Sequence, residues 1–361
     1  MAGTRGVGEP AINSSLAPPP MFLAAGGMDV MVDMIDHSNP AIKKQAAQAI
    51  FEACNDNPSN QQLVQQAGAM PKMVQMLQNS SGSEAKNRAA EAIAAMCSQN
   101  RDARVEALAN NALEPLVKML DAGNVQTQEN AANALANVII PRDDAREKGA
   151  RAPPGTGDSK GKTESKRDEI GDAQSALNDL DGVAKLIKLV EHGVPRVKEA
   201  AAAAIANAMV DNEENRKKFQ QAGGVGPLMG LLKSGNVYAQ ENAATALWNA
   251  MVDNEATQLD LIRHPHGIEI LVEVLFSGSD GIQEKAAGTI WKACVADPSI
   301  KDSLGIAIPG LVQVLKRGSP GARIQAAGAI RSACINSFSN KQQLNRHGGI
   351  ATLVINVIDK K

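Results

Sequence analysis

Apolar residues along this chain follow two alternating helical patterns. One is a Leu-rich segment that begins at a glycine or small-residue turn, as in residues 67–77 (AGAMPKMVQML). The other is an Ala-rich segment that follows a short polar break, as in residues 242–251 (NAATALWNAM). Apolar positions at intervals of three and four residues form one buried face of an α-helix. The chain is therefore predicted to pair Leu-rich helices with Ala-rich helices, whose small side chains let neighbours approach closely.

This pair of patterns recurs with a period of about 42 residues. A third, short and polar helical pattern precedes most of the turns, as in residues 60–68 and 215–223. A unit of this size cannot bury its apolar faces alone, so successive units must stack and share one core. About seven such units are predicted, with Leu-rich segments starting near residues 25, 67, 110, 180, 222, 266 and 347.

The period is interrupted between the turns near residues 111 and 182. This interval is about thirty residues longer than the intervals on either side of it, and the extra residues are rich in Pro, Gly and charge. We therefore predict a flexible N-terminal arm at 1–20, repeats over 21–140, a disordered insertion at 141–172, and repeats again over 173–361.

Composition narrows the class of protein. Aromatic residues make up only 2%, and 37 Lys and Arg nearly balance 39 Asp and Glu, so no basic field would attract nucleic acid. No run approaches the roughly 20 apolar residues that cross a bilayer. The four cysteines are far apart, which is typical of a reducing compartment. We expect an intracellular, cytoplasmic protein with no membrane insertion and no small-molecule substrate.

Residues that could carry catalysis or bind a cofactor are sparse. Residues 156–163 (TGDSKGKT) are similar to a phosphate-binding loop, but Thr156 stands where the first glycine is needed and no strand precedes it. His264 and His266 are the only two histidines close together, and a zinc site needs three or four ligands. We predict no catalytic residue, no metal and no cofactor.

The turns and helices over about 22–140 and 175–361 resemble the armadillo-repeat family. The resemblance implies an all-α fold, an armadillo-type right-handed superhelical solenoid of about seven three-helix repeats whose third helices line a concave groove. It also implies a non-catalytic scaffold that binds other proteins, either as extended segments or as subunits of a larger assembly.

The repeat phrases are also loosely similar to those of ciliary armadillo proteins in the axoneme and its central apparatus. That similarity implies axonemal partners and a location in the cilium or flagellum. A nuclear transport adaptor and a ligase-associated adaptor are the alternatives.

Asparagines recur on one face of the Ala-rich helices. Asn130, Asn133 and Asn137 lie on a single face. Two later helices carry Asn207, Asn242 and Asn249 at matching positions. Asparagine is a poor helix former, so its recurrence needs a reason. One interpretation, implied by the resemblance, is that these amides clamp the backbone of an extended partner; the other is that they bridge neighbouring repeats. The sequence leaves both open.

Two tryptophans and a lysine complete the candidates. Trp248 and Trp291 share one repeat position, either as anchors for a partner or as packing against the adjoining helix. Lys292 takes the place of the asparagine in its repeat.

Nuclear-import receptors pair each such asparagine with a tryptophan one turn earlier. The chain has no aromatic residue at those positions, which argues against cargo import. The positions hold Asn133, Ala203, Thr245, Gly288 and Gly328.

Overall fold

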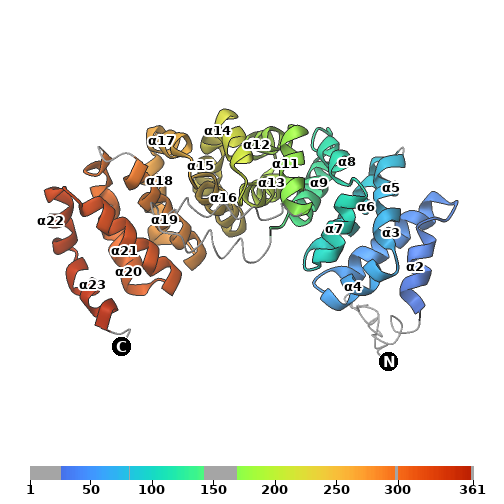
Figure 1. Ribbon diagram of the computed structural model, residues 1–361, viewed down its shortest axis with the longest axis horizontal. Helices are drawn as coiled ribbons and strands as arrows, with labels where there is room; N and C mark the ends of the chain where they lie inside the picture. Colours follow the sequence, from blue (N-terminus) through green and yellow to red (C-terminus); the bar gives the residue numbers. More distant parts are fainter. Residues whose placement is uncertain (1–25, 81, 142–168, 297–299, 359–361) are drawn as a thin grey trace, which may run out of the picture.

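The computed structural model describes residues 26–80, 82–141, 169–296 and 300–358. Every regular element within these ranges is helical, and the helices stack into one long arch (Figure 1). This confirms the predicted all-α armadillo-type solenoid. The predicted arm at 1–20 and residues 142–168 of the predicted insertion lie outside the described residues.

Each repeat contains up to three helices. The first helices are α4 (Pro58–Gln66), α7 (Arg101–Ala109), α11 (Glu169–Asp179), α14 (Glu213–Gln221), α17 (Glu255–Arg263) and α22 (Phe338–Arg346), with the 3₁₀ helix η3 (Ser303–Ala307) in the corresponding place of one repeat. The second helices are α2 (Met28–Met34), α5 (Ala69–Asn79), α8 (Leu113–Met119), α12 (Gly182–His192), α15 (Val225–Ser234), α18 (Gly267–Ser277), α20 (Ile308–Arg317) and α23 (Gly349–Ile358). The third helices are α3 (Pro40–Cys54), α6 (Ser83–Cys97), α9 (Val125–Val138), α13 (Pro195–Ala208), α16 (Val237–Ala250), α19 (Asp280–Ala296) and α21 (Pro320–Cys334).

A residue with positive φ stands at the corner before most second helices. Gly68 has φ of 74° and Gly223 of 68°, and the same corner is formed by His266 at 60°. Glycine adopts this left-handed conformation without a steric penalty, and short polar residues tolerate it better than apolar ones. The turn that marks the repeat in the sequence therefore recurs because the backbone needs positive φ there, and glycine is the residue that most often provides it.

A second recurrent corner joins each third helix to the next first helix. In three repeats a left-handed aspartate, Asp56, Asp211 or Asp253, is followed by an asparagine that caps the new helix. The side chain of Asn212 accepts a hydrogen bond from the Asn215 N–H at 2.9 Å. Such a cap stabilises a helix by about 1 kcal/mol, so this short Asp-Asn phrase fixes where the first helix begins.

The array continues across the interruption in the period. Asn207 of α13 donates from Nδ2 to the carbonyl oxygen of Ala136 in α9 at 2.8 Å, although the two residues are 71 positions apart. Helix α11 begins at Glu169, so the predicted insertion end at 172 is wrong by a few residues. The reason is that Ala173 and Leu177, one turn apart, are both buried, and this apolar pair extends the helix back into the polar segment.

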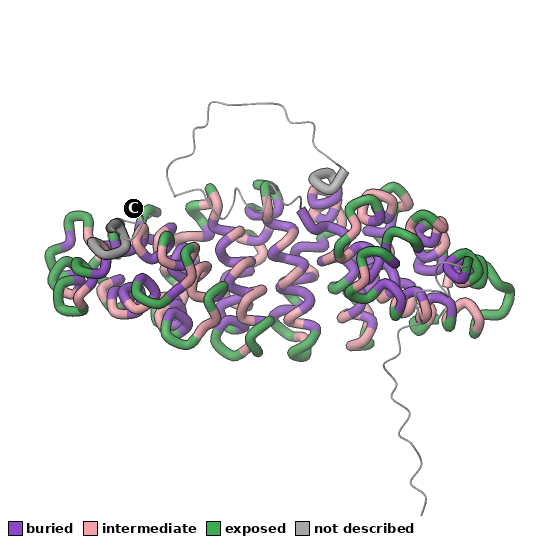
Figure 2. Tube along the Cα trace, turned by 90° about the horizontal axis from the view of Figure 1, so that it is seen from below, coloured by how far each residue is buried: buried purple, intermediate pink, exposed green. Residues whose placement is uncertain are grey.

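The core is built from aliphatic residues, methionine and alanine, as the composition predicts. Seen from below, buried positions run through the whole row of helices, and exposed positions gather at the turns (Figure 2). Within the described ranges, no helix is both long and apolar enough to cross a membrane.

The cysteines lead to a prediction about thiol reactivity. Burial raises the pKa of Cys54, Cys97 and Cys294 to about 12, and all three are inside the core. Cys334 is only partly buried. Because the thiolate is the reactive form, a thiol reagent at pH 8 should modify Cys334 first and the other three only after denaturant is added. Rapid labelling of all four cysteines in the folded protein would contradict this packing.

Candidate functional site

The third helices carry the predicted binding residues. In the middle of the arch α13, α16 and α19 lie on its inner side, beneath the second helices (Figure 1). We call the stripe on α9, α13, α16 and α19 the concave face. It consists of Asn130, Asn133, Asn137, Ala200, Ala203, Asn207, Asn242, Thr245, Asn249, Lys285, Gly288 and Lys292.

Three asparagines form a ladder between successive third helices. Asn137 donates to the carbonyl oxygen of Ala94 at 3.0 Å, and Asn249 donates to that of Ala206 at 2.9 Å. Asn207 makes the equivalent bond to Ala136. Each amide thus joins its own repeat to the one before it, which is the bridging interpretation of the sequence.

The hydrogen bonds between repeats do not use every donor and acceptor of these amide groups. A carboxamide has two N–H donors and an oxygen with two lone pairs. For Asn137 and Asn249 the described contacts use one donor each, and both side chains are only half-buried. The ladder can therefore hold the repeats together and still offer hydrogen bonds to a partner's backbone.

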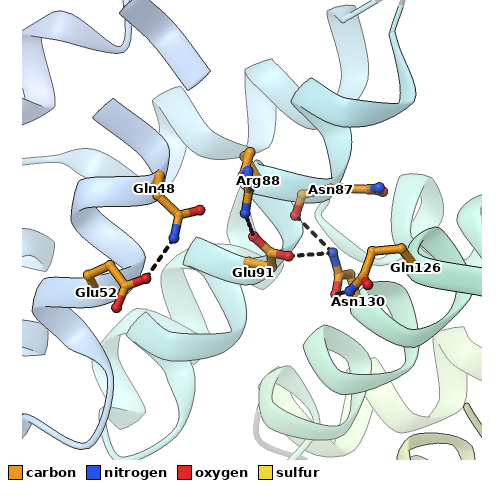
Figure 3. A network of polar contacts seen from close by, with 7 residues as sticks. All are labelled: Gln48, Glu52, Asn87, Arg88, Glu91, Gln126 and Asn130. Atoms are coloured by element: carbon orange, nitrogen blue, oxygen red, sulfur yellow. Dashed lines mark hydrogen bonds and ion pairs between the residues drawn. The ribbon is translucent and has the colours of Figure 1, made fainter. Parts of the chain in front are cut away.

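Asn130 and Asn242 lie two turns earlier on their helices and also bridge repeats. Asn242 donates to the carbonyl oxygen of Glu199 at 3.3 Å. Asn130 is buried in a polar network, where its Nδ2 donates to Oε1 of Glu91 at 2.8 Å and its Oδ1 accepts from Gln126 at 2.9 Å (Figure 3). Glu91 is in turn paired with Arg88. Asn130 therefore has a structural role.

Asn133 differs from the other asparagines. It is exposed, and within the described part of the chain its side chain makes no hydrogen bond. It is the asparagine of this stripe that a partner would reach most easily.

The tryptophans occupy different environments. Trp248 is 2% exposed, and a Cβ at Gly288 of the next third helix would overlap its ring. Of the two interpretations of Trp248, its burial favours packing against the adjoining helix, because the absence of a side chain at Gly288 leaves room for the ring. Trp291 packs in the same way over Gly328 but stays partly exposed.

Lys292 forms the next rung of the ladder. Its Nζ donates to the carbonyl oxygen of Trp248 at 3.1 Å and lies 4.1 Å from the centroid of the Trp248 ring. The residue is 6% exposed, and burial lowers the pKa of its amine to about 7. The carboxylate of Asp253 opposes this pKa shift, while the nearby charge of Arg216 adds to it.

The structure adds a row of glutamates that the sequence interpretation missed. Glu199 accepts from Nδ2 of Asn236 at 2.9 Å, and Glu241 accepts from Oγ of Ser279 at 2.6 Å. Both donors stand at the start of the next third helix, where a carboxylate is favoured by the helix dipole. The sequence contains the pattern that would have revealed this row, because a glutamate stands eight residues before each ladder residue. These glutamates are Glu129, Glu199, Glu241 and Glu284, before Asn137, Asn207, Asn249 and Lys292.

A cleft of about 730 Å³ lies away from the concave-face asparagines, between α5, α6, α8 and the turn before α9. Lys118 in its wall is already paired with Glu114 at 2.6 Å. This cleft therefore adds no residue to the candidate binding stripe.

The ladder leads to a stability prediction. Asn249→Ala should lower the free energy of unfolding by about 1 kcal/mol, because it removes a hydrogen bond between repeats and leaves the carbonyl of Ala206 without it. Asn133→Ala is the control, and it should change stability by less than about 0.5 kcal/mol. Urea denaturation compares the two; equal effects would mean that the ladder does not couple the repeats.

Comparisons with known proteins agree with this architecture. The family model for the armadillo/beta-catenin-like repeat matches residues 212–252 and 256–295. A second model, the SIL1/FES1/HPBP1 C-terminal domain, matches residues 20–139. No curated protein sequence matches the chain.

Solved structures with a similar fold include designed proteins. One engineered protein is 26% identical with a TM-score of 0.60, over 76% of this chain and 97% of its own. Another is 25% identical with a TM-score of 0.62, over 92% and 84%. A designed armadillo repeat protein in complex with the peptide (KR)4 is 19% identical with a TM-score of 0.52, over 85% and 99%, which bears on the fold alone. The three-helix repeats, the ladder and the repeat model matched over residues 212–252 and 256–295 together show that this chain is built from armadillo-type repeats.

Proposed function

We propose that this chain is a non-catalytic scaffold that holds an extended segment of a partner protein along its concave face. The observation that carries the proposal is the ladder of half-buried amides, one on each of three successive third helices. In two of them, Asn137 and Asn249, the described contacts use only one of the two N–H donors. An extended backbone presents unpaired N–H and C=O groups to each side at intervals of about 7 Å. Neighbouring helices are about 8–10 Å apart, so successive rungs meet successive sets of these groups.

Two solved structures of similar fold add support. One designed armadillo repeat protein is in complex with a peptide, and others were designed for modular peptide recognition. Their likeness to this chain extends to the fold, and the ladder is this chain's own reason for expecting the same kind of partner.

Random dodecapeptides displayed on phage, selected against the full chain, test this function. We expect peptides that bind the chain and lose at least about tenfold in affinity to a variant with Asn137→Ala, Asn207→Ala and Asn249→Ala, because each bond made by the amides contributes about 0.5–1.5 kcal/mol. A control with Asn79→Ala and Asn345→Ala, both exposed and outside the stripe, should bind as the original chain does. Circular dichroism checks that both variants fold. The proposal fails when no peptide is selected, or when the triple variant binds equally well.

For the cellular setting we propose the ciliary axoneme, with axonemal proteins as partners. The support is the similarity of the repeat phrases to those of ciliary armadillo proteins. Cross-linking and mass spectrometry of native extract tests it, and we expect cross-links to tubulin or axonemal subunits. Cross-links to import cargo alone would instead favour the nuclear transport adaptor.

A further inference from the structure

Lys292 is a cation in an unusual position on the concave face. It is nine-tenths buried, and no carboxylate of the described residues lies within ion-pair distance of its Nζ. Its described polar partner is the backbone carbonyl of Trp248, which takes one of three N–H donors. A buried charge without a paired counter-ion is costly, so this rung differs from the neutral asparagine rungs beside it.

A second amine lies nearby. Nζ of Lys285, two turns earlier on α19, is 5.5 Å from the centroid of the Trp248 ring, over which Lys292 also lies. Gly288, between the two lysines in sequence, leaves the space that the ring fills. Lys285 has only a loose ion pair with Glu284, at 3.6 Å. Two amines thus lie close together on the stripe. Among the described residues, the ion pair between Lys285 and Glu284 is the carboxylate contact that they make.

The carboxylates elsewhere on the third helices are already engaged. Glu199 and Glu241 accept hydrogen bonds from the start of the next helix, and Glu129 is paired with Arg196 at 2.9 Å. The charge on the stripe that lacks a partner is therefore positive and lies on α19. A carboxylate is the group that complements it.

We propose that Lys285 and Lys292, over the ring of Trp248, form a carboxylate-binding subsite for an aspartate or glutamate side chain of the extended segment that the asparagine ladder holds. This inference rests on the proposed function. It adds to that function a chemical requirement on the partner, namely one acidic residue in register with α19.

The subsite should respond to pH. An anion binds the charged amine, and burial places the pKa of Lys292 at about 7. The charged groups that face this amine are Asp253, Arg216 and Lys285. Affinity for an acidic segment should therefore be highest below pH 7 and fall by up to about tenfold per pH unit above it.

The same phage selection tests the subsite. Peptides selected on the original chain should share one acidic position, and its Glu→Gln version should bind about 10- to 100-fold more weakly. Lys292→Asn introduces the residue that occupies the equivalent positions 207 and 249. This variant should lose both the preference for an acidic peptide and the pH dependence of binding. Lys188→Asn, an exposed lysine of α12, should keep both.

The outcomes separate this inference from the function on which it rests. Peptides that depend on the asparagine ladder but share no acidic position, or that bind equally well with Gln, overturn the subsite and leave the scaffold intact. A selection that yields no peptide overturns both. The Glu→Gln comparison needs no protein variant, so it remains decisive even when Lys292→Asn does not fold.

Discussion

Gly288→Ala is expected to lower the free energy of unfolding by about 3 kcal/mol, because an added methyl group in a well-packed contact forces side chains and backbone apart. A Cβ at this position would overlap the ring of Trp248. Trp248 is 2% exposed, so a shift of its ring disturbs the packing of the side chains around it. Urea denaturation of the purified chain measures the effect.

A matched control for this substitution lies in α15. Gly230 has no atom within 4 Å of its added Cβ, so Gly230→Ala should be neutral or stabilising by up to about 1 kcal/mol, as alanine favours helix. In a Trp248→Leu background, Gly288→Ala should cost less than about 1 kcal/mol. An equal cost with and without the tryptophan would show that the two residues do not pack together.

Lys292→Met is expected to raise the free energy of unfolding by about 2 kcal/mol at pH 7, because a buried cation is replaced by an apolar side chain of similar length. Burial lowers the pKa of Lys292 in the folded chain from 10.5 to about 7. Between these two values the unfolded chain binds more protons than the folded chain, so the stability of the original protein rises with pH. The advantage of the methionine variant should therefore be largest below pH 7 and shrink towards pH 10.5.

Urea denaturation of both proteins from pH 6 to pH 10 tests this sign. The face of the Trp248 ring stabilises the charged amine of Lys292. The stability difference between the two proteins is therefore smaller than burial of the charge alone would give. A methionine variant that is less stable than the original chain at pH 6 would contradict this prediction. It would show that contacts in the folded chain offset the cost of burying the Lys292 charge.

The sequence predicted the repeat period from the turns, where the same backbone conformation recurs and glycine adopts it most readily. The turn before most second helices has a residue with positive φ, and glycines at 68, 223 and 348 revealed its period. The same corner at Asn111, Asp181 and His266 also has positive φ, which explains why the period stayed visible where glycine is absent. The fold could therefore be predicted from the pattern.

The site could be predicted only in part, because its contacts join repeats that are distant in the sequence. The spacing placed Asn137 and Asn249 on one face, but the partners of their amides are carbonyl groups 43 residues away. The burial of Trp248 depends on a missing side chain at Gly288 in the next repeat. Comparing equivalent positions in adjacent repeats, rather than along one helix, would have revealed both this pair and the glutamate row.

The central claim is that the repeats before residue 142 and those after residue 168 stack into one solenoid, with α9 and α13 as direct neighbours on the concave face. Asn133 and Ala203 hold the same position on α9 and α13, which are hydrogen-bonded through Asn207 and Ala136. In a Cys334→Ser background, a short bismaleimide should cross-link Asn133→Cys to Ala203→Cys within one chain, since packed helices are about 8–10 Å apart. The pair Asn133→Cys and Thr245→Cys, one repeat further, should not be spanned. Failure of the first pair to cross-link, or equal cross-linking of the second, would contradict the continuous array.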